Sequence, residues 1–77
     1  MDMNVNRQIW QGLNEHWKIA YQDARLARHK ATAAFVACKA GHGTGPTDGQ
    51  LAEVDRLERL ADERKMAEEA FLKSVFG

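Results

Sequence analysis

Small residues recur along the first half of the chain at alternating steps of four and three residues, which keeps successive side chains on one stripe of an α-helix. Five neighbouring positions of this stripe are alanines, so the stripe is almost flat and a second helix is expected to approach it closely. The pattern predicts architecture and carries no chemistry of its own. The stripe consists of Leu13, Trp17, Ala20, Ala24, Ala27, Ala31, Ala34 and Cys38.

The first helix is expected to run from about residue 7 to residue 40. Asn4 and Asn6 are both suitable N-caps, since a short side-chain oxygen satisfies the free amide groups at a helix start. Gly41 suits the left-handed residue that closes a helix, and Pro46 prevents the helix from continuing. The chain is therefore expected to turn after this helix.

A second helix is expected over about residues 49–75, after a loop of residues 41–48. Thr47 and Gln50 have the spacing of a capping box, which marks a helix start. The apolar positions that follow recur with a period near 3.6 and form a broader stripe than that of the first helix. They are Leu51, Val54, Leu57, Leu60, Ala61, Ala67, Ala70, Phe71, Leu72, Val75 and Phe76.

A short connection between two long helices makes them antiparallel neighbours. The predicted fold class is all-α: a coiled-coil-like antiparallel two-helix hairpin with an alanine-rich seam. Pairing across the loop places Arg64 over Ala24, with its stem packed on the small residue. The other expected pairs are Cys38 with Leu51, Ala34 with Val54, Ala31 with Leu57, Ala27 with Ala61, Trp17 with Phe71 or Leu72, and Leu13 with Val75.

Length, composition and charge limit the class of protein. The 77 residues suffice for one small domain, expected to span 1–77. The single cysteine forms no internal disulfide and no apolar run reaches bilayer-spanning length, so we expect a cytoplasmic protein without a membrane partner. The net charge is zero, but residues 1–40 carry +3 and residues 41–77 carry −3, so the two helices attract one another.

No residue pattern predicts catalysis, a cofactor, a metal or a small-molecule substrate. The glycine-rich loop lacks the Gly-Lys-Ser/Thr ending of a P-loop and follows a helix rather than a strand. Cys38 and His42 are four residues apart, but a zinc site needs three or four ligands and commonly a second close pair, so Cys38 is interpreted as a small core residue. No nucleophile–base–orienter set surrounds His16, His29 or His42, so we expect no enzyme.

The densest basic patch comprises Arg25, Arg28, His29 and Lys30. On a helix these residues cover a wide arc, which favours a solvated face that attracts the acidic second helix. Contact with phosphate through Arg25, Arg28 and Lys30 is the alternative, and it would make the chain a small nucleic-acid-associated regulator. Overall neutrality and the lack of an interleaved aromatic residue argue against this alternative.

Two helices cannot enclose two tryptophans and two phenylalanines at the free end of the hairpin, because each helix covers only one side of the other. More apolar residues lie off the primary stripe: Ile9, Ile19, Tyr21, Leu26, Phe35, Val36 and Met66.

Exposed apolar surface on this scale is typical of an interaction site. We therefore expect a non-enzymatic protein–protein interaction module, such as an adaptor, a chaperone-like protein or a regulatory subunit. The expected partner is a second copy that completes a four-helix bundle, or a different protein. The expected interface residues are Trp10, Leu13, Trp17, Tyr21, Phe71, Leu72, Val75 and Phe76.

Overall fold

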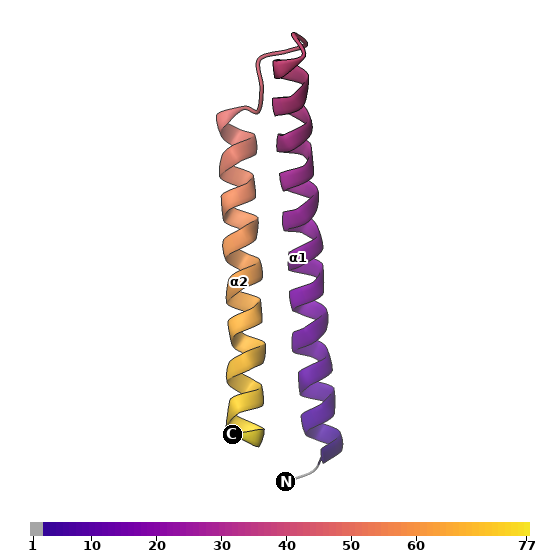
Figure 1. Cartoon of the computed structure of the whole chain (residues 1–77). Helices are drawn as coiled ribbons and strands as arrows, with labels where there is room; N and C mark the ends of the chain where they lie inside the picture. The colour runs from indigo at the N-terminus through magenta and orange to yellow at the C-terminus, as the bar shows by residue number, and fades with distance from the viewer. Residues whose placement is uncertain (1–2) are drawn as a thin grey trace.

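In a computed structural model, which describes residues 3–77, the chain forms two long α-helices joined by one loop. Helix α1 spans Met3–Lys39 and helix α2 spans Asp48–Phe76. The helices lie side by side and antiparallel, and together they form a rod of 60 × 16 × 15 Å (Figure 1). The predicted all-α antiparallel hairpin is confirmed.

Helix α1 begins earlier than the sequence pattern indicates. It starts at Met3, so Asn4 and Asn6 lie within the first helical turns and the expectation that either is an N-cap is wrong. Asn6 is buried, one step of seven residues before Leu13 on the stripe that faces α2. The stripe therefore extends to the start of the described helix, with a polar residue in it.

Helix α1 ends in a Schellman motif, as Gly41 predicts. The His42 amide donates to the Ala37 carbonyl at 2.7 Å, and the Gly41 amide donates to the Cys38 carbonyl at 3.0 Å. Gly41 has φ of +85°, a conformation in which a Cβ atom clashes with the backbone. The glycine at this position is thus required by the geometry of the helix end.

The loop does not turn directly into α2. Figure 1 shows it passing over the end of α1 and then running back beside that helix before α2 begins. In this return segment, Gly45 packs against the side chain of Cys38. Helix α2 then starts with the predicted capping box, in which the Gln50 amide donates to Thr47 Oγ1 and the Thr47 amide donates to Gln50 Oε1.

The alanine seam forms as predicted along most of its length. Ala20, Ala24 and Ala31 are buried against α2, where Val54 and Ala61 are buried in turn. Leu13, Trp17, Ala27 and Ala34 are half-buried on the same stripe. Cys38 is exposed, so the interpretation of this residue as part of the core is wrong. The cause is the return segment of the loop, because α2 begins below the level of the last turn of α1 (Figure 1).

The same return segment shifts the pairing between the helices. The Lys65 ammonium lies 4.4 Å from the centre of the Trp17 ring, where the sequence placed Phe71 or Leu72. Arg64 is exposed instead of packing over Ala24, and Lys65 takes the position on the seam. The predicted pairs assumed a tight turn, and a loop that runs back along α1 places each residue of α2 opposite an earlier residue of α1.

The hairpin encloses very little. No side chain of residues 3–77 is fully buried, and the hydrophobic residues with the least exposure are four alanines and one valine. The chain exposes 6006 Å², whereas a compact protein of 8.7 kDa exposes about 4,700 Å². Its radius of gyration is 17.4 Å, against about 11 Å for a compact domain of this length. The two helices alone thus leave about 1,300 Å² more surface in water than a self-contained domain of this mass.

Candidate interaction surface

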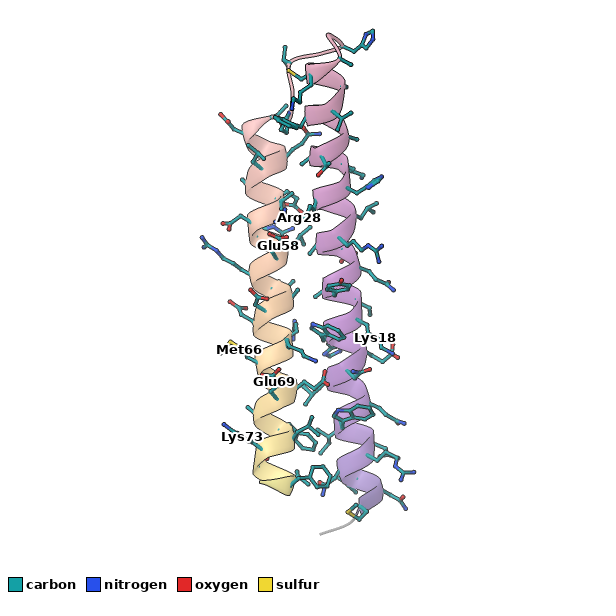
Figure 2. The ribbon with its side chains drawn as sticks, viewed as in Figure 1. Lys18, Arg28, Glu58, Met66, Glu69 and Lys73 are labelled. Carbon is teal, nitrogen blue, oxygen red and sulfur yellow. The ribbon has the colours of Figure 1, made fainter. Side chains whose placement is uncertain are left out.

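One side of the hairpin is closed by polar contacts between the helices. Arg28 donates from Nε to Glu58 Oε2 at 2.6 Å and from Nη2 to Glu58 Oε1 at 2.7 Å (Figure 2). These hydrogen bonds lower the pKa of Glu58 and raise the pKa of Arg28. Both side chains are in contact with water, so the pair orients the helices more than it stabilises them.

The same side carries the aromatic contacts of the middle of the rod. Trp17 and Tyr21 are one helical turn apart, with ring centres 5.5 Å apart and planes tilted by 31°. The Lys65 ammonium lies over the Trp17 ring in a cation–π contact. Tyr21 and the Arg28–Glu58 pair line a single shallow groove. We call this side, defined by Tyr21, Arg28 and Glu58, the paired face.

A buried carboxylate lies within the seam. Glu68 has 4% of its surface exposed, and both of its oxygens lie 3.4 Å from Asn14 Nδ2. Hydrogen bonds of this length are weak. A polar pair at one position of a helical seam favours a single register, at some cost in stability. The sequence pattern did not predict the burial of Glu68, since acidic residues on an amphipathic helix are usually exposed.

The opposite side of the hairpin is open, and residues 3–77 form no ion pair between the helices there. Leu26 and Leu57 line a groove on this side together with charged residues of both helices, and within α2 Arg56 donates from Nε to Glu53 Oε2 at 3.0 Å. The charged residues are Asp23, Lys30, Glu53 and Arg56. Leu26 has 56% of its surface exposed, and besides this groove it lines a hollow on the surface of α1 with Arg25 and Arg28. The groove runs between the helices, so a partner that enters it would contact both.

Steps of seven residues from this groove identify other residues on the same side of the rod, because seven residues make two turns of a helix in a coiled coil. From Leu26 the step leads back to Ile19, and from the groove residue Asp23 two steps lead back to Ile9. On α2 the steps lead from Glu53 to Leu60 and from Leu57 by way of Arg64 to Phe71. We call this side the open face, and its members are Ile9, Ile19, Leu26, Leu57, Leu60 and Phe71.

The structure divides the predicted interface residues between the seam and the surface. Most of them are half-buried where the two helices meet: Trp10, Leu13, Trp17, Phe71, Leu72 and Val75. Tyr21 and Phe76 are exposed. The Trp10 indole N–H is buried and has no acceptor among residues 3–77. The structure thus brings these residues to the free half of the rod, but Tyr21 lies on the paired face and Phe71 on the open face.

Sequence reasoning noted Ile19 and Leu26 as lying off the seam, but not that they belong to one surface. Their spacing of seven residues was the available signal. What the sequence alone lacked was the position of α2, which determines that the leucines of both helices line the same groove.

The three residues of the alternative nucleic-acid site do not share a surface. Arg28 is bound to Glu58, and it lies with Arg25 along the groove of the paired face. Lys30 lines the groove of the open face beside Glu53. The structure therefore places Lys30 in a different groove from the two arginines.

Metal binding and membrane insertion find little support in the described part of the chain. Cys38 and His42 lie at the loop end, and residues 3–77 bring no three His, Cys, Asp or Glu side chains together as ligands for a metal. Neither α1 nor α2 has a stretch apolar enough to cross a lipid bilayer.

Comparison of the chain with models of protein families, with curated proteins and with solved structures finds no match. The function is therefore argued from the geometry of the hairpin.

Proposed function

We propose that the chain is a non-enzymatic protein–protein interaction module whose folded state is completed by its partner. The observation that carries the proposal is that a well-formed hairpin of 77 residues buries no apolar side chain larger than valine. The stability of a small domain comes mainly from buried apolar surface, and this chain has little of it when alone.

The surplus surface is of the size that protein partners cover. A standard interface buries about 800 Å² on each partner, and obligate interfaces bury more. The hairpin exposes about 1,300 Å² beyond what its mass requires, so covering it would form an interface of the obligate size class. The proposal places the module in the cytoplasm, since one free cysteine requires no oxidising compartment.

The proposal is tested by the stability of the chain in dilute solution. A hairpin that depends on a partner should be marginally stable as a monomer, and its helical circular dichroism should melt at low temperature without a steep transition. Sedimentation of the same samples identifies the concentrations at which the chain is monomeric. A monomer that unfolds cooperatively above about 65 °C, beyond the usual range of mesophilic domains, would contradict the proposal.

A further inference from the structure

We propose that a second copy of this chain packs on the open face, with α1 of one copy against α2 of the other and with both loops at the same end of a four-helix bundle. This inference rests on the proposed function, because it names the partner and the surface of the module.

The two faces differ in what a partner would have to displace. On the paired face, a partner would remove the bidentate Arg28–Glu58 pair from water, and the desolvation of two charges opposes such burial. On the open face, the bidentate Glu53–Arg56 pair lies within α2 and does not join the two helices, and a partner would also cover Leu26 and Ile19, which have 56% and 55% of their surface exposed. Burial of aliphatic side chains is favourable at about 25 cal/mol for each Å². The open face is therefore the surface that association favours.

A second copy meets the requirements of the open face without any further component. The face lies on both helices and runs along the rod, so two copies face to face bring four helices around one core. Twofold symmetry makes this assembly closed, since each open face covers the other and none remains. The surplus of about 1,300 Å² per chain lies within the range that obligate interfaces bury, about 1,000 Å² or more on each partner.

Charge selects between the two ways of pairing the hairpins. If the loops lie at opposite ends, α1 packs on α1 of the other copy, and α2 packs on α2. Helix α1 carries six basic and two acidic residues, and α2 carries five basic and eight acidic residues, so both contacts would join helices of like charge. If the loops lie at the same end, each α1 packs on an α2 of opposite charge.

The border of the groove supports the same-end arrangement. Lys30 of α1 and Glu53 of α2 line one groove and therefore lie at similar heights along the rod. A twofold axis along the rod preserves these heights, so Lys30 of each copy comes level with the Glu53 carboxylate of the other, which also accepts from Arg56 of its own helix. An ion pair across the rim of an interface contributes more to the choice of partner orientation than to affinity.

A matched pair of substitutions tests the face. Leu26→Glu places a carboxylate on the open face, while it can pair with Lys30 one turn later and so keeps the helix intact. Val36→Glu is the control, because Val36 is also on α1, has 59% of its surface exposed and lies on neither groove. By sedimentation equilibrium, we expect Leu26→Glu to weaken the dimer at least 100-fold and Val36→Glu to leave it within about threefold of wild type.

The native cysteine tests the orientation without any substitution. Cys38 is the only cysteine and is exposed in the last turn of α1, so a nitroxide label attaches there alone. With loops at the same end, the two helix ends lie about 10–15 Å apart and the labels within about 25 Å. With loops at opposite ends, the labels are separated by most of the length of α1, about 50 Å. Pulsed electron–electron double resonance on the wild-type protein distinguishes these distances.

Each outcome decides a defined part of the inference. A dimer that survives Leu26→Glu, or that Val36→Glu disrupts equally, overturns the choice of face, and a distance of about 50 Å overturns the orientation. A wild-type chain that is monomeric and poorly folded at every concentration overturns the second copy as partner, while the interaction module stands. A monomer that is cooperatively folded overturns the module as well.

Discussion

Replacing Ala24 by leucine tests the close approach of the two helices. Ala24 has 5% of its surface exposed and lies on the seam near Ala61, which has 6% exposed, so a leucine side chain at this position would press on α2. Inserting side-chain carbons into a packed seam forces the helices apart and costs about 1–3 kcal/mol. For a domain of this size the melting temperature should fall by about 5–20 °C, since each kcal/mol corresponds to about 4–8 °C.

The control for this substitution is Ala52→Leu, because Ala52 is exposed on the outer surface of α2. Leucine and alanine both favour helix, so Ala52→Leu should change stability by less than about 0.5 kcal/mol. Thermal melts followed by circular dichroism at one fixed protein concentration compare the variants with wild type. If Ala24→Leu has the same melting temperature as Ala52→Leu and wild type, the helices do not approach closely at Ala24 and the seam is wrongly placed.

Charge and backbone conformation give three further expectations. Arg28 lowers the pKa of Glu58, so the stabilisation from this pair is present above the unfolded-state pKa and is lost as pH falls through the lower folded-state pKa. Glu58→Gln should therefore melt at a lower temperature than wild type at neutral pH, and this difference in melting temperature should vanish in acid. Glu68→Leu should raise stability by about 1 kcal/mol or more in urea titrations, because it removes a buried carboxylate with only long hydrogen bonds; a loss would show that the carboxylate is stabilising. Gly41→Ala should cost about 1–2 kcal/mol in the same titrations because φ is positive there, whereas Gly12→Ala within α1 should gain about 0.5–1 kcal/mol; effects of equal sign would contradict the assigned helix end.

The parts of the fold that depend on local spacing could be predicted from the sequence. The alanine stripe, the Gly41 helix end and the Thr47 capping box each depend on residues within a few turns of one another, and the structure has all three. Helix propensity and capping chemistry act over this range, so one sequence suffices to identify them. The two-helix hairpin follows once these elements are in place.

The register between the helices could not be predicted in the same way. The register depends on the path of the loop, and the spacing of turn residues does not predict that Gly45 packs against Cys38. The consequence extends to the candidate surface. With α2 shifted, Lys65 instead of Arg64 faces the seam, and Glu68 is buried there. Hydrophobicity alone does not predict that charged residues lie at these positions, because the packing of their stems or their hydrogen bonds determine where they lie.

The distribution of side-chain sizes across the rod indicates where the main core lies. In a self-contained domain, large apolar side chains are enclosed and small ones lie wherever the packing requires them. Here the most buried hydrophobic positions are four alanines and Val54, while Leu26 and Ile19 are more than half exposed. The seam therefore sets the distance between the two helices of a hairpin, and the larger side chains lie where a third and a fourth helix would meet them. On this argument, Ala24→Leu acts first on the spacing within the hairpin, whereas Leu26→Glu acts on association alone. A dimer weakened by Leu26→Glu with unchanged helicity, beside a loss of stability in Ala24→Leu, would separate the two roles.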